Sequence, residues 1–187
     1  MRSSPVQTKI LTPTEAAVLG LIGGREMSGY DLLKFAKTSV AYFWSPARSQ
    51  LYSVLPRLVE AGLAKSRVVK QRNRPDKQLY KLTPAGRAAL SAWVNELQRP
   101  EPDRNPLLLQ LFFGEHGDPA ALLEHVRARR RELEQLEADI LEYERIALPN
   151  ESEVFRGMTR RYGLAYARAL MRWARETERE LEARVSR

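Results

Sequence analysis

The feature that most constrains this chain is a succession of three elements between residues 45 and 90: a helix, a strongly basic hairpin and a second helix. Ser45 and Pro46 have the residue types of an N-cap and of the first helical position, where a missing N–H has no cost. Gly62 is suited to end this helix, because glycine accepts the left-handed backbone found just beyond many helix C-termini. These signals predict a helix that starts at Ser45 and ends at Gly62.

A basic hairpin follows this helix directly. Residues 63–69 and 78–82 have strand character on either side of the polar segment KQRNRPDK, and Thr83 with Pro84 is a typical helix start. Residues 63–81 contain seven basic residues and one acidic residue. A helix followed by a basic hairpin is the arrangement of a winged helix, whose wing lies along the DNA backbone. We therefore expect a mainly α fold with an N-terminal winged helix-turn-helix, a two-stranded wing and a C-terminal helical dimerisation domain.

The net charge of the chain is distributed unevenly. Residues 1–100 carry 16 Lys and Arg against 6 Asp and Glu, a net +10, whereas residues 101–187 carry 15 against 17, a net −2; together they give +8. A basic half of this kind indicates a polyanionic partner. The absence of cysteine excludes disulfides and thiolate zinc sites. Because no apolar run reaches the ~20 residues of a membrane span and no signal-peptide core is present, we expect a cytoplasmic protein with no membrane partner.

The N-terminal half contains two further helix starts. Thr12 with Glu15 and Ser28 with Asp31 have the spacing of a capping box, in which a hydroxyl and a carboxylate each accept a backbone N–H. The proline-rich segment RPEPDRNP is predicted to be a linker. The predicted organisation is a winged-helix DNA-binding domain at 1–98, a linker at 99–105 and a helical dimerisation and effector domain at 106–187.

Three helices are predicted after the linker. The first is a short apolar helix at 106–113, the second starts at Asp118 and Pro119, and the third runs from about Val154 to Arg184. Both long helices carry apolar residues mostly three or four positions apart, as coiled-coil helices do, with Arg129 at one position of the stripe in the second helix. In the second helix these positions are Leu122, Val126, Leu133, Leu136, Ile140, Tyr143 and Ala147, and in the third they are Phe155, Met158, Tyr162, Ala165, Ala169, Trp173 and Leu181.

These apolar stripes predict a homodimer, because two long helices and one short one make a small closed core by themselves. The expected dimerisation residues are Leu122, Val126, Leu133, Leu136, Ile140, Tyr143 and Trp173. The alternative is that the two long helices form a hairpin within one chain and bury their stripes against each other.

Motifs along most of the chain, in order and at matching spacing, resemble those of the PadR family of bacterial transcriptional regulators. They are Gly29-Tyr30, Gln50-Leu51-Tyr52, Leu58, Gly62-Leu63, Arg74-Pro75 and Tyr80-Lys81-Leu82-Thr83-Pro84-Ala85-Gly86, followed by LLLQLFFG at the start of a C-terminal domain like the longer one of the family. The resemblance implies a homodimeric winged-helix regulator, usually a repressor, that reads a roughly palindromic operator in double-stranded DNA. It also implies, as an expectation, release by a small aromatic or otherwise hydrophobic effector.

One residue departs from the pattern of this family. Pro56 lies inside the predicted recognition helix, where a charged or polar residue is usual. Proline removes the hydrogen bond to the Tyr52 carbonyl and crowds the preceding turn, so we expect a kink. The assignment of a DNA contact to Arg57, which follows the kink, therefore depends on the local geometry.

The expected DNA-contact residues lie at the second helix start, on the third helix and on the wing. They are Ser28, Tyr30, Arg48, Ser49, Gln50, Tyr52, Ser53, Arg57, Arg72, Arg74 and Lys77. Arg48 and Gln50 are the candidates for base contact, because arginine pairs with guanine and glutamine with adenine in the major groove. A structural role for Gln50, packing of Tyr30 under the first helix, and a merely solvated basic wing are the alternatives.

Trp93 is the candidate effector-binding residue. It lies on the helix that follows the wing, and paired tryptophans in a dimer can hold a flat aromatic ligand between them. Family members that bind planar drugs have a tryptophan in this region. The alternative is that Trp93 and Trp173 are ordinary core or interface residues.

The sequence does not indicate an enzyme or a cofactor. The two histidines, His116 and His125, lie in no metal-ligand spacing and beside no evident nucleophile, so no metal and no catalytic residue is expected. Besides a sequence-specific regulator, the alternative is a winged helix that serves protein interaction or non-specific nucleic-acid binding. Preference for one operator over bulk DNA would separate the two.

Overall fold

The chain divides into two compact units, Met1–Pro100 and Glu101–Arg187. The computed structural model describes residues 10–40, 42–44, 47–71, 76–98, 104–146 and 151–186. Most of the predicted linker, like Arg72 and Arg74 of the wing, lies outside the described residues. Within the described part of the chain, no helix has both the length and the apolar character that a membrane span requires.

Four helices form most of the N-terminal unit. They are α1 (Pro13–Leu21), α2 (Gly29–Ser39), α3 (Arg48–Glu60) and α4 (Pro84–Asn95). Both predicted capping boxes are confirmed, with Thr12 and Glu15 at the start of α1 and Ser28 and Asp31 at the start of α2. These caps accept backbone N–H groups that have no partner within the helix, so each start is determined locally.

The recognition helix α3 begins two residues later than predicted. Its N-cap is Ala47, and Ser45 and Pro46 lie outside the described residues. The Ala47 side chain cannot accept a hydrogen bond, and the backbone N–H of Ala47 donates to Oε1 of Gln50 at 3.3 Å. At the other end, the N–H of Gly62 bonds the Val59 carbonyl, that of Leu63 bonds the Leu58 carbonyl, and Gly62 has φ +70°. This Schellman geometry confirms the predicted helix end and turns the chain into the wing.

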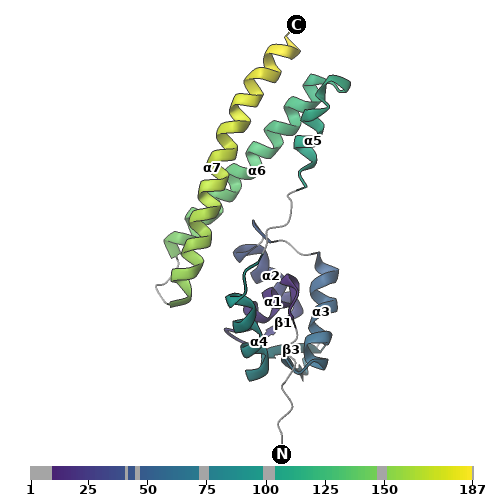
Figure 1. Ribbon diagram of the computed structural model, residues 1–187, viewed down its shortest axis with the longest axis vertical. Coiled ribbons are helices and arrows are strands. Elements are labelled where there is room, and N and C mark those ends of the chain that lie inside the picture. The colour runs from purple at the N-terminus through teal and green to yellow at the C-terminus, as the bar shows by residue number, and fades with distance from the viewer. Residues whose placement is uncertain are drawn as a thin grey trace, which may run out of the picture. The chain divides into compact units, whose positions relative to one another are not determined.

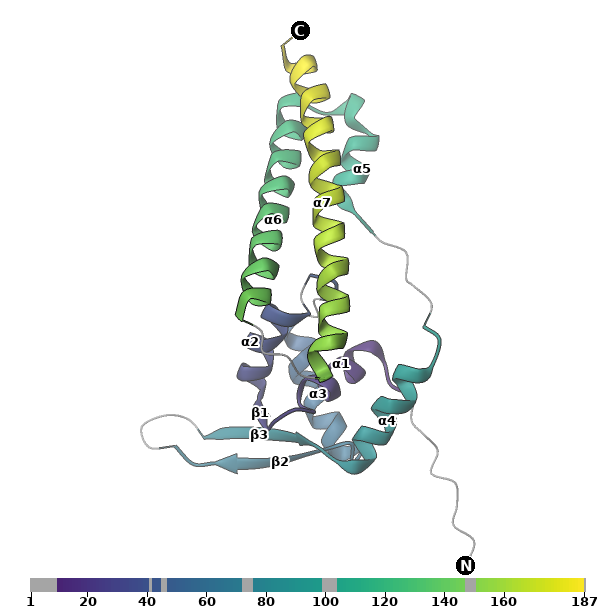
Figure 2. The ribbon, with the colours of Figure 1, turned by 90° about the vertical axis from the view of Figure 1, so that its left-hand side faces the viewer.

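The wing belongs to a three-stranded antiparallel sheet rather than to an isolated hairpin. Its strands are β1 (Met27–Ser28), β2 (Ala64–Val69) and β3 (Lys77–Leu82), in the order β1-β3-β2. In Figure 2, β2 and β3 lie side by side next to the helices of this unit. The predicted two-stranded wing is confirmed as β2 and β3. The third strand, β1, was not predicted, because a two-residue strand that directly precedes a helix cap has no recognisable periodicity.

The core of the N-terminal unit lies between α1, α3 and the sheet. The fully buried residues are Val18, Leu19, Ile22, Met27, Leu32, Leu51, Val54, Leu55 and Leu58. On α3, Leu51, Leu55 and Leu58 follow at spacings of four and three and are all buried, and Val59 packs against the same cluster. The opposite side of α3 consequently faces solvent.

The C-terminal unit consists of α5 (Pro106–Phe112), a short 3₁₀ helix (Gly114–His116), α6 (Pro119–Ile146) and α7 (Glu151–Val185). Figure 1 shows α6 and α7 side by side as a long antiparallel hairpin, with α5 beside the start of α6. Asn105 caps α5, and its Oδ1 accepts the N–H groups of Leu107 and Leu108. Leu107 and Leu111 pack against the end of the hairpin core.

The predicted dimer stripe of α6 is buried within one chain, which corrects that prediction. Leu122, Val126, Leu133 and Ile140 are buried. Leu122 and Val126 cluster with Ala174 and Leu181 of α7, and Leu133 clusters with Ala167 and Met171 of α7. Leu136 and Trp173 pack partly buried against the same clusters, and Tyr143 donates to Glu153 on α7. Because α7 covers this stripe, the hairpin alternative is right for α6.

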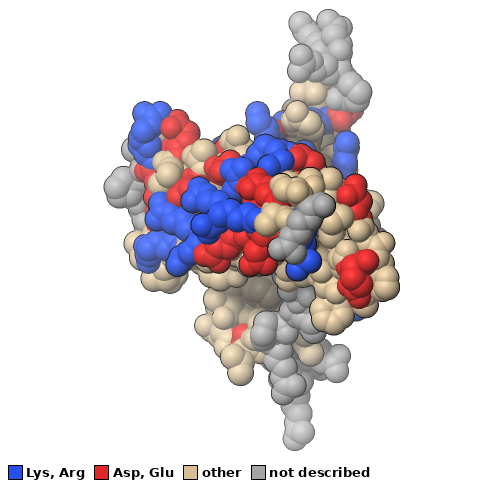
Figure 3. Space-filling view, turned by 90° about the horizontal axis from the view of Figure 1, so that it is seen from above, with Lys and Arg blue, Asp and Glu red and all other residues tan. Residues whose placement is uncertain are grey.

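Arginine–glutamate pairs join the two helices along their length. They are Arg127–Glu182 (2.7 Å), Arg130–Glu178 (2.7 Å), Arg168–Glu137 (2.6 Å) and Arg160–Glu144 (3.8 Å). Arginine lies on α6 in the first two pairs and on α7 in the last two, so the charges match only in the antiparallel register. Basic and acidic side chains are accordingly interleaved on the surface seen in Figure 3.

Candidate nucleic-acid interface

The exposed side of α3 carries the side chains predicted to meet DNA. Arg48, Ser49, Tyr52, Ser53 and Arg57 are all exposed. Cζ of Arg48 lies 5.6 Å from the centroid of the Tyr52 ring, and this ring is itself 41% exposed. Such stacking orients a guanidinium without occupying its donors, so Arg48 can still form two hydrogen bonds to one acceptor edge.

The start of α2 supports this surface through a close contact with Tyr52. A Cβ added at Gly29 would lie 2.6 Å from Cε1 of Tyr52, so the ring rests directly on the backbone of α2. Tyr30, the next residue, is 68% exposed, which excludes the alternative that it packs under α1. Two tyrosines from different helices therefore accompany Arg48 on one surface.

Ser28 is not available for the phosphate contact predicted for it. The residue is buried, and its hydroxyl donates to Oδ2 of Asp31 at 2.8 Å while accepting the Asp31 N–H at 3.2 Å. The Asp31 carboxylate also places a negative charge at this helix start, where a phosphate would otherwise bind. The sequence indicated both the cap and the phosphate site, and the structure supports only the cap.

Two other polar side chains of α3 have partners within the helix. Oε1 of Gln50 accepts the Ala47 N–H, which agrees with the structural alternative, and Oγ of Ser53 donates to the Gln50 carbonyl at 3.0 Å. Pro56 is exposed and the helix continues through it to Glu60. The predicted kink and the DNA contacts of Ser53 and Arg57 stay predictions.

The wing is joined to the start of α2 by an ion pair that the sequence did not reveal. Nζ of Lys77, the first residue of β3, lies 2.9 Å from Oδ2 of Asp31, so this predicted DNA contact already has an acidic partner. A second pair joins Arg67 on β2 to Glu26 at 2.6 Å. Arg67 and Glu26 are 41 positions apart in the sequence, and no periodic pattern connects them.

Lys77 and Ser28 shift the pKa of the Asp31 carboxyl. The hydrogen bond from Lys77, with a smaller contribution from Ser28, lowers its pKa from 3.8 to about 2. Because the folded state holds the lower pKa, the associated stability is present above pH 3.8 and is lost as the pH falls toward 2.

We therefore expect Asp31→Asn to lower the free energy of unfolding at pH 6 by about 1 kcal/mol, a value discounted for a partly exposed pair. The difference from the wild-type protein should disappear between about pH 4 and pH 2. Urea unfolding of both proteins at several pH values measures this difference in the free energy of unfolding. If the difference stayed constant between pH 6 and pH 2, the ion pair would not stabilise the fold.

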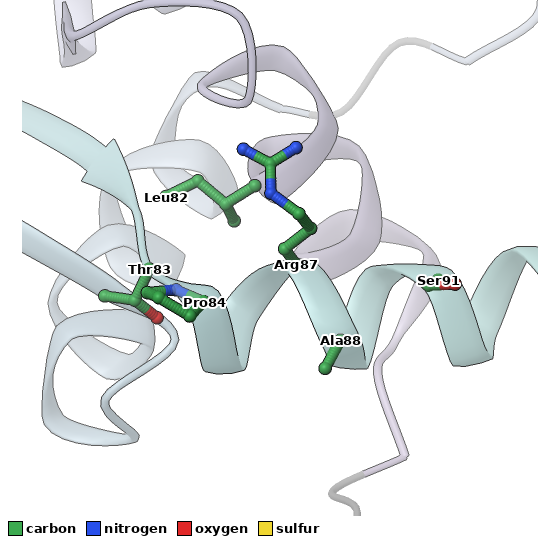
Figure 4. Close-up of a pocket in the computed structure, with 6 residues that line it drawn as sticks. All are labelled: Leu82, Thr83, Pro84, Arg87, Ala88 and Ser91. Carbon is green, nitrogen blue, oxygen red and sulfur yellow. The ribbon is translucent and has the colours of Figure 1, made fainter.

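The predicted effector residue is part of the N-terminal core. Trp93 packs, partly buried, against the main hydrophobic cluster. An open hollow lies nearby along the first turns of α4, and Figure 4 shows its lining. The lining residues are Leu82, Thr83, Pro84, Arg87, Ala88 and Ser91. Trp93 is not among them, so this hollow does not supply the predicted aromatic site.

Comparisons with known proteins agree with this geometry. Residues 18–92 match the family model described as the transcriptional regulator PadR-like family, and residues 104–182 match the one described as virulence activator alpha C-term. A probable transcriptional regulator of Mycobacterium tuberculosis is 32% identical over 126 residues, which cover 62% of this chain and 67% of that protein. The chain belongs to the PadR-like family of transcriptional regulators. This family consists of DNA-binding regulators and not of enzymes.

This PadR-like regulator is also similar to a second sequence relative and to solved structures. The negative transcriptional regulator PadR of Bacillus subtilis is 34% identical over 98 residues, which span 52% of this chain and about half (54%) of that protein. Its crystal structure in complex with operator DNA has a TM-score of 0.74 at 22% identity and covers 89% of this chain and 98% of that one. A PadR-like regulator of Bacillus cereus has a TM-score of 0.75 at 24% identity, covering 91% and 99%. These likenesses establish the winged-helix fold with C-terminal helices.

Proposed function

We propose that this PadR-like regulator is a homodimeric repressor that binds a roughly palindromic operator and is released by a small aromatic or hydrophobic effector. The observation that carries the proposal is the Arg48–Tyr52 stack on the exposed side of α3, supported from below by Gly29. Among the described residues Arg48 has no acidic partner, so its donors are free to bind a base edge or a phosphate. The repressor assignment is supported by the name of the Bacillus subtilis relative.

The dimer proposal rests on apolar surface that the chain itself leaves uncovered. On α7, Val154, Phe155, Met158 and Tyr162 are each more than half exposed. On α5, Leu108, Leu109 and Phe112 are each at least half exposed, as is Phe113 at the C-cap of this helix. Monomeric proteins rarely expose this many large apolar side chains on one compact unit. A second copy of this chain is the proposed partner, since a palindromic operator requires two-fold symmetry.

The effector proposal is supported by a relative and by one residue of this chain. The structure of Bacillus subtilis PadR has been determined in complex with p-coumaric acid. In this chain Trp93 offers an indole that is only partly buried. An effector bound near it would release the DNA only by favouring a dimer geometry in which the two α3 helices no longer fit successive major grooves.

The test is a fluorescence-anisotropy titration of the DNA upstream of the protein's own gene against random-sequence competitor. We expect Arg48→Ala to weaken binding by about 10- to 100-fold, the effect of losing one bidentate base contact. Arg87→Ala on α4 is the matched control and should change the affinity little. p-Coumaric acid, added to the wild-type complex, probes effector release.

Each result of this titration has a definite meaning. Preference for the upstream DNA that Arg48→Ala abolishes supports a sequence-specific regulator. Equal affinity for every duplex, with Arg48→Ala and Arg87→Ala alike, would contradict the proposal and favour a non-specific or protein-interaction module.

A further inference from the structure

The start of α2 contacts both parts of the proposed DNA-binding surface through two residues of its first turn. Gly29 lies against the ring of Tyr52 on α3, and Asp31 pairs with Lys77 on β3. Tyr30 lies between them and is exposed. Two residues of one helical turn, Gly29 and Asp31, thus connect the recognition helix with the wing.

Asp31 is held firmly enough to orient its partner. A single oxygen, Oδ2, accepts the Ser28 hydroxyl at 2.8 Å, the Ser28 N–H at 3.2 Å and the Lys77 ammonium at 2.9 Å. Ser28 is itself a residue of β1, which pairs with β3 through Ser28 and Leu79. The carboxylate is therefore fixed by the same segment that forms the sheet edge.

The ion pair between Arg67 and Glu26 joins the other wing strand, β2, to the segment before α2. Glu26, just before β1, accepts two hydrogen bonds from Arg67 on β2, at 3.0 Å from Nε and 2.6 Å from Nη2. Each strand of the wing is thus joined by one cation to the segment from Glu26 to Asp31. Arg67, and more weakly Lys81 and Lys65, lower the pKa of Glu26. Among the described residues of the wing, Lys70 is a further basic residue with no ion pair.

We propose that Asp31 and Lys77 are positioning residues, which hold the wing against the start of α2 and so set its orientation relative to α3. This inference rests on the proposed DNA-binding function and refines it. Lys77 then contributes to operator affinity through Asp31 rather than through a phosphate contact of its own. Lys70, which is exposed and has no acidic partner among the described residues, is the matched lysine for a direct phosphate contact.

Asp31→Asn separates the two roles by the sign of its effect. Removing a negative charge from a DNA-binding surface strengthens binding if only electrostatics matters. Loss of a positioning contact weakens it. We expect Asp31→Asn and Lys77→Gln each to weaken operator binding several-fold. The double variant should bind no more weakly than either single variant. Lys77→Arg, which keeps the positive charge, should bind the operator as the wild-type protein does.

The salt dependence of binding provides a second, independent reading. A lysine that neutralises one phosphate contributes about 0.9 to the slope of log K against log [salt]. We expect Lys77→Gln to leave this slope unchanged and Lys70→Gln to reduce it by about 0.9. A reduction of this size for Lys77→Gln, or tighter binding by Asp31→Asn, would overturn the inference.

Hydrogen exchange tests the positioning role without any DNA. Amides of β2 and β3 should exchange faster, and to the same extent, in Asp31→Asn and Lys77→Gln, whereas Lys70→Gln should match the wild-type protein. Unchanged exchange in both variants would overturn the inference even if the operator titration succeeds. If the wild-type protein prefers no duplex, the proposed function fails, and the exchange measurement still decides whether the ion pair orients the wing.

Discussion

Replacing Gly86 with alanine is expected to lower the free energy of unfolding of the N-terminal unit by about 3 kcal/mol, the upper range for overpacking. Gly86 lies in the first turn of α4, where its N–H donates to the cap Oγ1 of Thr83 at 3.0 Å. A Cβ at this position would lie 1.9 Å from the carbonyl oxygen of Leu63 and 2.8 Å from Cδ1 of Leu82.

The size of this effect follows from what the new methyl group meets. A flexible side chain can move aside, but the Leu63 carbonyl is held in place because it accepts both the N–H of Thr83 at 3.2 Å and its hydroxyl at 3.0 Å. The start of α4 must therefore move away from the wing and lose these bonds. Alanine gains about 1 kcal/mol over glycine in a helix interior, which is too little to offset the loss.

Urea unfolding measures this difference. In a Trp173→Phe background the fluorescence comes from Trp44 and Trp93, both in the N-terminal unit. Gly24→Ala is the matched control, because a Cβ there meets no atom within 4 Å. It should stabilise by no more than about 1 kcal/mol through its effect on the unfolded chain. Equal midpoints for the two variants would refute the close-approach argument.

The double variant Phe155→Asp/Met158→Asp is expected to be monomeric and to bind the operator about 100-fold or more weakly than the wild-type protein, since both half-sites then bind independently. Both side chains are more than half exposed on α7, on the side away from the packed clusters of the hairpin. Their replacement should leave the fold of one chain intact while placing charges in the proposed interface.

Sedimentation equilibrium gives the mass, and the same anisotropy titration gives the affinity. Ala128→Asp is the control, because it adds a charge at an exposed position of α6 outside the apolar patch. This control should stay dimeric. If the double variant kept the wild-type mass, the exposed patch of α7 would not be the dimer interface.

Local signals in the sequence determined most of the N-terminal unit. Capping residues at Thr12, Ser28 and Thr83 and the left-handed glycine at Gly62 set helix ends through hydrogen bonds to near neighbours. Such signals need no knowledge of the tertiary fold. The apolar spacing of Leu51, Leu55 and Leu58, which is also local, leaves Arg48 and Tyr52 on the outer side of α3.

Which of two apolar stripes on α7 faces α6 could not be decided from the sequence. The first part of the predicted stripe, Phe155, Met158 and Tyr162, is exposed, and only its later members Trp173 and Leu181 pack against α6. Ala167, Met171 and Ala174, which were not predicted, are buried. Small residues allow α7 to lie close to the leucines of α6, and periodicity alone does not reveal which stripe has the complementary shape.

The partners of polar residues were likewise decided by the tertiary structure. The sequence showed that Ser28, Gln50 and Lys77 can bind phosphates or bases, but their nearest partners are Asp31, the Ala47 N–H and again Asp31. The sequence by itself determined a winged helix with a basic wing and an arginine on its recognition helix, because caps, glycines and apolar spacing act over a few residues. Only the tertiary structure decided which charges are paired and which stripe is covered, because those partners lie on segments distant in the chain.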